Sequence, residues 1–538
     1  MRLRKANVIA VSAAITAAGL WFGIARSIAA DAPVQAILPQ AGPPPYDRST
    51  RPDLPSRFTR PDNPQVFDER VKAFRDREIS QMKMRGRFTV AVGGDIISTF
   101  PIAQLEDPAL QAILNIVRSA DIGVGNSEAN IIDYAKAGCC LGGMMAPKET
   151  AADMKAMGFD MVNKASNHIA DTGVSILPEN LEILRDAGIA YAGSGRNLQE
   201  ARAPGYMSTP KGRAAIVGSY AGVVACHQCA PDSDNSGSDM WPAQFASYQL
   251  GFAYGMSGLN PLRVTRYNVV PQADFDMLRA FDTANRAARG QRAAAAGSTL
   301  NLNGTWYKIG PAEDRGTSSY TIYPDDLMQI ERSVRNGKEQ SDFLSVLVHA
   351  HQSRGPGPRE PDHIVAYAHG VIDNGADLFA RSGPWELRGI EIYKGRPIFY
   401  GLGLMVASHM NTPVGYDRYR DNQQDPFASE FTDTELNWVS WYGPNVIAEA
   451  DRTNIRSMES AVAEAVFQDG KLVEVVVTPM QLGYDRPMSQ MGIPRIATGA
   501  VAQRILKRIQ DLSKDLGSTL AIKGDKGTIR VGPDGRSL

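Results

Sequence analysis

The chain has 538 residues, of which 43% are hydrophobic and 21% charged, and its formal net charge at pH 7 is -1. This composition is typical of a globular protein and excludes a coiled coil or a wholly disordered chain. The near-neutral charge offers no basic footprint for nucleic acid, so we expect no nucleic-acid partner.

The first 29 residues have the pattern of a targeting segment. The positively charged MRLRK precedes the apolar run ANVIAVSAAITAAGLWFGIA and small residues that suit cleavage after Ala29. The run has about 20 residues, which is long enough to span a bilayer. Two alternatives therefore stay open, a cleaved signal peptide or a retained membrane anchor. In both cases we expect an exported body, in the bacterial periplasm or at the outer face of the cytoplasmic membrane.

Two further segments precede the folded domain. Residues 30–66 are rich in proline, aspartate and arginine and lack apolar periodicity, which predicts an extended tether. Within 67–87, FDERVKAFRDREISQM predicts a leading helix. We expect one large domain over residues 88–538.

From Phe88 onward, short apolar strands alternate with amphipathic helices. The predicted strands are RFTVAVGGD, DIGVGNSEAN, FDMVNKASNH and IAYAGSG. The helices predicted between them are DPALQAILNIVRSA, APKETAADMKAMG and ILPENLEILRDAG. This alternation predicts an α/β fold with a largely parallel sheet, in which ligands collect at the carboxyl ends of the strands.

The later part of the chain is less regular in sequence. After the predicted strand AAIVGSYA, residues from about 226 to 340 are expected to be irregular insertions with short helices. The α/β pattern returns at DFLSVLVHAHQ. A C-terminal completion over about 411–538 contains a predicted β-ribbon that turns at Asp469-Gly470 and a final helix in GAVAQRILKRIQDLSKDLG.

The four cysteines lie in two clusters, Cys139 with Cys140 and Cys226 with Cys229. In an oxidising compartment they predict two disulfide bridges between the clusters. A redox-active C-x-x-C pair, or half of a zinc site, is the alternative for Cys226 and Cys229.

Polar residues follow two of the predicted strands. Asp95 comes directly after an apolar strand, where a carboxylate serves as a metal ligand or general base, or as a helix N-cap. Asn126 and Glu128 are two residues apart, so on an extended strand their side chains point the same way. An amide oxygen and a carboxylate on one side suit a hard metal ion. The alternative is a hydrogen-bonded loop.

Histidines follow two other strands. SNHIADTG places Asn167 beside His168, a candidate metal ligand or general acid, and Asp171 is positioned to orient its ring or to cap a turn. His349 and His351 are two residues apart after FLSVLV, and two histidines on one side of a strand end can ligate one metal ion. Together, the strand ends predict a polar pocket for a divalent metal or a phosphate group.

The order of these motifs resembles the CapA family of capsule and poly-gamma-glutamate synthesis proteins. The resemblance runs from about Phe88 to the end of the chain, through GGD, NSE, SNHIADTG, GSGRNLQEA, HAH and NGADL…GPWELRGIEIYKGRPIFYGLG. That family in turn resembles calcineurin-like metallophosphoesterases. The resemblance implies a four-layer α/β/β/α sandwich with two mainly mixed β-sheets, and a divalent metal held at the sheet edge. The ligands that it implies are Asp95, Asn126, Glu128, Asn167 and His349, with His351 beside them.

The fifth loop departs from the family pattern Gly-His-x-Pro-His. In RSGPWELRG, Ser382 and Trp385 stand where the histidines are expected. The loss of two imidazoles implies at most one site of mixed oxygen and nitrogen ligands, not a two-metal centre. Arg381 and Glu386 are left as candidate binding residues for a different substrate.

Two functions are compatible with this resemblance. The first is an exported protein that acts in the synthesis, export or anchoring of an anionic capsule polymer such as poly-gamma-glutamate. Metal-assisted hydrolysis or acyl transfer would be its chemistry, with His168 as acid/base. The alternative is a non-catalytic scaffold that binds the polymer or its membrane synthase through a degenerate metal site.

Overall fold

The computed structural model describes residues 81–538 except 138–143, 172, 174, 224–254, 295, 354–358, 416–418, 421–422 and 443–455, together with Glu69 and Ala73. Nearly all of them belong to the compact unit of residues 73–538. The predicted targeting segment and tether, most of the leading helix and all four cysteines lie outside the described residues. Among the described residues, no helix combines the length and apolarity needed to cross a membrane.

One large sheet is built around the first strand of the domain. Its members are β1 (Arg87–Ile97), β2 (Ile122–Ser127), β5 (Met161–Asn163), β6 (Ala190–Ala192), β19 (Leu404–Ala407), β20 (Glu459–Gln468), β21 (Lys471–Gln481), β22 (Arg495–Ile496), β23 (Ala521–Lys523) and β24 (Lys526–Arg530). The main order is β23-β24-β21-β20-β1-β2-β5-β6. β1, β2, β5 and β6 run parallel, whereas β20 runs antiparallel to β1. The sheet is therefore mixed.

A second large sheet has its own parallel centre. Its members are β8 (Gly205–Thr209), β9 (Gly212–Val223), β11 (Pro261–Val270), β12 (Thr299–Leu302), β13 (Thr305–Ile309), β14 (Ser318–Ile322), β15 (Phe343–Ala350), β16 (Leu378–Ser382), β17 (Ile390–Tyr393) and β18 (Arg396–Phe399). β9, β15 and β16 are parallel neighbours. Two short pairs complete the described strands, β3 (Asn130–Ile132) with β4 (Met145–Pro147) and β7 (Ser194–Gly195) with β10 (Gly258–Leu259).

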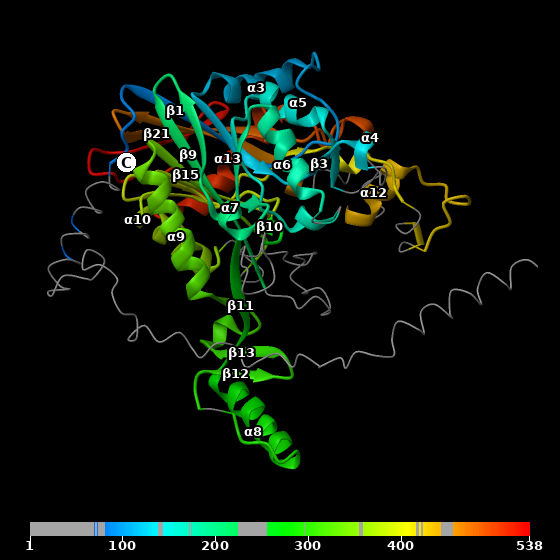
Figure 1. The fold of residues 1–538 in the computed structure, drawn as a ribbon, viewed down its shortest axis with the longest axis vertical. Helices are drawn as coiled ribbons and strands as arrows, with labels where there is room; N and C mark the ends of the chain where they lie inside the picture. Colours follow the sequence, from blue (N-terminus) through cyan, green and yellow to red (C-terminus); the bar gives the residue numbers. More distant parts are fainter. Residues whose placement is uncertain are drawn as a thin grey trace, which may run out of the picture. The chain divides into compact units, whose positions relative to one another are not determined.

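The described helices flank the two sheets or extend from them (Figure 1). They are α3 (Pro108–Ser119), α4 (Tyr134–Ala137), α5 (Glu149–Met157), α6 (Leu177–Asp186), α7 (Leu198–Arg202), α8 (Gln272–Ala288), α9 (Pro324–Glu339), α10 (Asp362–Asp373), α12 (Asp433–Tyr442) and α13 (Gly499–Lys514). Sequence dictates several ends. For example, α3 starts with Pro108, and the Asp107 carboxylate caps it by accepting from the backbone N–H groups of Ala109 and Leu110.

Three buried clusters define four layers. Outside the first sheet, Ile113 of α3 and Met154 of α5 belong to one apolar cluster with Ala91 of β1. Alternate residues of β1 point the other way, so Phe88 packs between the sheets, with its ring centroid 5.3 Å from that of Phe343. Outside the second sheet, α9 and α10 pack on Val346 and its neighbours. The expected α/β/β/α sandwich is confirmed.

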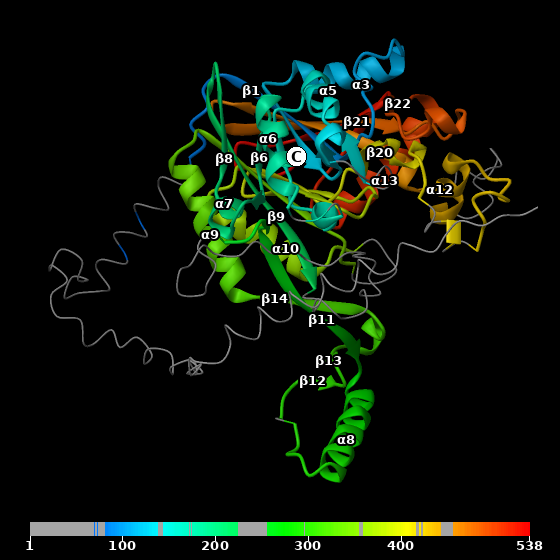
Figure 2. The same cartoon turned by 45° about the vertical axis from the view of Figure 1, so that its right-hand side comes forward.

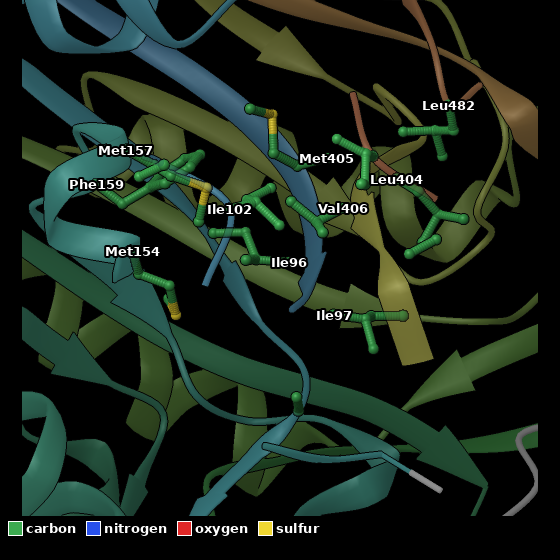
Figure 3. Packing of buried hydrophobic residues seen from close by; sticks show 14 of the residues in the cluster. Ile96, Ile97, Ile102, Met154, Met157, Phe159, Leu404, Met405, Val406 and Leu482 are labelled. Carbon is green, nitrogen blue, oxygen red and sulfur yellow. The ribbon is translucent and has the colours of Figure 1, made fainter. Parts of the chain in front are cut away.

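The outer cluster of the first sheet also holds the end of β1 in place. Figure 3 shows Ile96 and Ile97 of β1 with Leu404, Met405 and Val406 of β19 in this cluster. The backbones approach closely there, because a Cβ atom on Gly94 would lie 1.7 Å from the carbonyl oxygen of Gly403. Only glycine fits at position 94. The GGD motif thus seats the strand end that carries Asp95.

The expectation of irregular insertions up to about residue 340 is wrong for much of the described part. β11 first pairs with β9 at its start and then with β14 and β13. α8 follows β11. Figures 1 and 2 show α8 with β12 and β13 beyond the end of β11 that is distant from β9. The alanine- and arginine-rich sequence around residue 288, which was expected to be irregular, includes the end of α8, a helix of 17 residues. By contrast, the predicted ribbon turn is confirmed, with positive φ at both Asp469 and Gly470.

A buried histidine in α10 makes stability depend on pH. Both ring nitrogens of His363 lack a hydrogen-bond partner among the described residues. Burial, aided by the Arg381 charge, lowers the pKa of His363 to about 3. Between that value and the ordinary pKa near 6.5, the unfolded chain holds a proton that the folded chain does not. Above pH 6.5 the buried neutral His363 therefore costs no stability. The free energy of unfolding decreases as the pH falls from 6.5 toward 3.

We expect His363→Phe to flatten the acid side of the stability profile. At pH 5 the proton on the unfolded chain costs the wild type about 2 kcal/mol, and phenylalanine removes that cost. Urea unfolding at pH 7.5 and pH 5 measures the difference. His369→Phe on the same helix is the matched control and keeps the wild-type pH dependence, since His363 is still present. An equal acid loss in His363→Phe and wild type would contradict the interpretation.

Candidate metal site

Strand ends from both sheets converge on one buried site. In the first sheet, Asp95 of β1 lies in register with Asn126 of β2. In the second sheet, His349 near the end of β15 lies in register with Tyr220 of β9 and Ser382 of β16. Because these strands are parallel within each sheet, their carboxyl ends meet at a common edge. The predicted convergence of polar strand ends is therefore present in the fold.

Asp95 lies beneath the site as a hydrogen-bonded anchor. Its Oδ1 accepts from the Asn126 amide at 2.8 Å and lies 3.2 Å from His349 Nδ1. Its Oδ2 accepts from the backbone N–H of Gly383 at 2.9 Å. The alternative of a helix N-cap is wrong, because Asp95 lies within β1 and the next helix has Asp107 as its cap. Asp95 is placed to orient His349 by accepting from Nδ1.

Asn126 forms a second part of this anchor. Its Oδ1 accepts from the side-chain amide of Asn163 at 2.8 Å, and its Nδ2 lies 3.0 Å from His349 Nδ1. Both ends of the Asn126 amide are therefore engaged within the described residues. Its position supports the histidine from behind.

Three side chains present their ligand atoms to one point. Glu128, His349 and His351 each offer one atom, and all three atoms lie within 4.8 Å of one another. The Nε2 atoms of the two histidines are 3.0 Å apart. Asn167 Oδ1 lies 3.0 Å from His349 Nε2 and 3.3 Å from His351 Nε2. This cluster of two imidazoles, one carboxylate and one amide oxygen has the donor set of a divalent-metal site.

The charge of the cluster supports the same conclusion. Glu128 is fully buried, and its Oε1 has no hydrogen-bond partner among the described residues. Burial, followed by the nearby Asp95 charge, raises the pKa of Glu128 well above its usual range. Burial lowers the pKa of His351 well below its usual range, which leaves a neutral ring available as a ligand. A buried carboxylate oxygen that faces imidazole nitrogens is stabilised by a cation, so these residues fit a divalent metal.

His168 lies at the more accessible side of the cluster. It sits in a single 3-10 turn, Asn167–Ala170, that follows β5. Its Nδ1 is 2.7 Å from Asp171 Oδ2, and its Nε2 is 3.7 Å from Glu128 Oε1. Asp171 thus orients the ring, as one of the two sequence interpretations had it. A histidine with one nitrogen fixed by a carboxylate and the other facing the site can act as an acid or base.

The fifth loop contributes to the site with side chains other than imidazoles. Ser382 Oγ lies 2.9 Å from His349 Nδ1, and Trp385 Nε1 donates to Glu128 Oε2 at 3.3 Å. Trp385 has a φ of 54°, which is unusual for a bulky residue. The loop therefore fixes Glu128 and His349 by hydrogen bonds.

Two other predicted binding residues lie behind the loop. The Arg381 guanidinium donates to Glu360 at 2.7 Å and to the backbone carbonyl oxygens of Ala350 and Gln352. The Glu386 carboxylate accepts from Arg508 of α13 at 3.3 Å. Neither contacts the ligand cluster in the described structure.

Residues that the sequence did not single out complete the surroundings. The fully buried Lys164 donates to the carbonyl oxygens of Ser127 and Ala129, the two residues that flank Glu128, at 3.2 and 2.7 Å. Burial lowers its pKa to about 7. The ring of Tyr220 stacks on His349, with centroids 5.9 Å apart. No local pattern marks these residues, because only their burial beside the cluster gives them importance.

Known proteins are similar in sequence to this chain over most of its length. The family described as bacterial capsule synthesis protein PGA_cap matches residues 89–409. Two proteins of Sinorhizobium fredii (strain NBRC 101917 / NGR234), described as uncharacterized proteins y4sH and y4uA, are each 33% identical to this chain over 456 residues. Each match covers 82% of this chain and 93% of the relative.

Two further matches are more distant in sequence. The capsule biosynthesis protein CapA of Bacillus anthracis is 24% identical over 142 residues, or 24% of this chain and 34% of that protein. A 5'-nucleotidase precursor of Thermus thermophilus has a TM-score of 0.27 and 9% identity, covering 73% of this chain. The chain spans 54% of the length of that solved structure, and this likeness adds nothing to the assignment of the site. The match over residues 89–409 shows that the chain belongs to the PGA_cap family of bacterial capsule synthesis proteins, as its resemblance to CapA predicted.

Proposed function

We propose that this protein acts outside the cytoplasm in the synthesis, export or anchoring of an anionic capsule polymer such as poly-gamma-glutamate, by metal-assisted hydrolysis or acyl transfer. The observation that carries the proposal is the convergence of Glu128, His349 and His351 in a member of a capsule synthesis family. The membrane synthase of the polymer is the partner that this role implies.

The residues divide the chemistry between them. Glu128, His349 and His351 would hold a divalent ion, with the Asn167 oxygen beside them. When bound, such an ion supplies Lewis-acid polarisation of a carbonyl or phosphoryl group. His168 moves the proton at its Nε2, while Asp171 keeps its Nδ1 end fixed. Asp95 and Ser382 orient His349 through Nδ1.

The test is a chain-length assay on the purified protein. We expect poly-gamma-glutamate incubated with the protein and manganese or zinc to shorten, or to be transferred to an amine acceptor, as seen by gel filtration. Both His168→Ala and chelation of the metal should abolish the change. The substitution removes the group that transfers the proton, and chelation removes the Lewis acid. His369→Ala, which alters a histidine outside the site, should leave it intact. Turnover that survives both His168→Ala and chelation would overturn the mechanism.

A non-catalytic scaffold is the second candidate, and one observation favours it. The CapA resemblance predicts a histidine ligand at position 385. Here the position holds Trp385, whose indole N–H donates a hydrogen bond to Glu128 Oε2. A scaffold would bind the polymer without changing its length. The absence of both a stoichiometric divalent ion and a metal-dependent rise in melting temperature would support this function over the catalytic one.

A further inference from the structure

A cavity lies beside the end of the fifth loop, where Gly389 lines it. It has a volume of about 1270 Å³ and is bounded by one face of α13, the start of α10 and the segment that leads into β20. Five basic side chains line it, and they are Arg359, Arg456, Arg504, Lys507 and Arg508. Acidic side chains also line it, so the pairing of each charge decides what the cavity can bind.

Asp362 and Asp515 line the cavity together with three acids that form ion pairs. Glu360 is paired with Arg381 at 2.7 Å, and Glu459 with Arg504 at 2.5 Å. Asp511 pairs with Lys507 one helical turn away. These acids are therefore neutralised within the wall of the cavity.

Guanidinium groups gather at one end of the cavity. Arg456 is exposed and forms no ion pair among the described residues, and its charge acts on Arg508. Arg388 is a further like charge near Arg508, and the acid shared by the two is Glu386, at 3.3 Å from Arg508 and 3.9 Å from Arg388. Arg508 and Arg388 thus share the Glu386 carboxylate, and Arg456 adds a third like charge beside Arg508. Guanidinium groups in this arrangement bind carboxylate or phosphate oxygens in bidentate fashion.

The fifth loop connects this cavity to the metal site. Trp385 points its indole N–H at Glu128 on one side, and the next residue, Glu386, binds Arg508 on the other. We propose that the arginine-lined cavity between α13 and α10 is a binding site for an anionic ligand that carries at least two carboxylate or phosphate groups. The site does not need the metal. If the proposed function is right, it holds a part of the polymer chain next to the metal site.

The test measures anion binding by calorimetry on the whole protein, after metal has been stripped by a chelator and the chelator removed by dialysis. Short poly-L-glutamate and inorganic tripolyphosphate are the two probes, and they distinguish a carboxylate from a phosphate ligand. We expect Arg456→Gln to weaken binding of the preferred probe about tenfold, since one charge-assisted contact is lost. Arg508→Gln should do the same, and raised salt should weaken binding in the wild type.

Matched variants separate this site from the metal site. Arg530→Gln changes an exposed arginine on β24 and should leave anion binding unchanged. His349→Ala should also leave it unchanged, and Arg456→Gln should keep metal binding, so the cavity and the proposed function fail independently. Binding of neither probe, or equal binding by wild type and both cavity variants, would overturn the proposal.

Discussion

His349→Ala weakens divalent-metal binding by more than about 100-fold, which exceeds the 10–100-fold loss typical of residues that only support a ligand. The reason is the central position of this ring. Its Nε2 faces Glu128, His351 and Asn167, whereas its Nδ1 is fixed by Asp95 and Ser382. Titration calorimetry with manganese or zinc measures the effect.

Two further variants sharpen this expectation. Glu128→Gln keeps the shape of the side chain but removes its charge, and should lower the affinity to a similar extent. His369→Ala is the matched control, since His369 pairs with Glu391 outside the site. Wild-type affinity in His349→Ala would mean that the cluster does not hold the metal.

Lys164→Met lowers metal affinity about 10–100-fold while the protein still folds. Lys164 holds the carbonyl oxygens on both sides of Glu128, so its loss releases the segment that presents the carboxylate. Methionine keeps most of the volume, and the two carbonyl groups lose a donor worth about 0.5–1.5 kcal/mol for each hydrogen bond. Calorimetry gives the affinity, and circular dichroism confirms that the fold is kept.

The control for this prediction is a different lysine, Lys155, which forms an ion pair with Asp160. Lys155→Met removes the partner of Asp160 in α5, which contacts none of the candidate ligands in the described structure, and should leave metal affinity unchanged. Equal metal affinity in Lys164→Met and wild type would show that Lys164 only fills space. A loss restricted to the melting temperature would lead to the same conclusion.

Much of the fold could be predicted because its signals are local. The strand that carries Asp95, the helix from Pro108 and the turn at Asp469-Gly470 follow from apolar periodicity, capping and turn chemistry. The length of α8 could not be predicted in this way, because the alanine- and arginine-rich sequence at its end is also typical of an irregular insertion. The helix becomes evident only once β12 and β13 give it a surface to pack on.

The candidate site divides in the same way. Glu128, Asn167, His349 and His351 follow recognisable strands, so their convergence could be expected from the sequence. The roles of Lys164 and Tyr220 could not, because each is defined by burial against residues that are distant in sequence. Asp95 and Asn126 carry the right chemistry for ligands, yet their contacts with Nδ1 place them behind His349.

The most direct test of the metal site is anomalous diffraction from crystals grown with manganese or zinc. We expect one strong anomalous peak per chain, within about 2.0–2.3 Å of Glu128 Oε1, His349 Nε2 and His351 Nε2. A second peak at the fifth loop would contradict the single mixed site. No peak at the cluster, or a peak only elsewhere on the protein, would contradict the metal assignment itself.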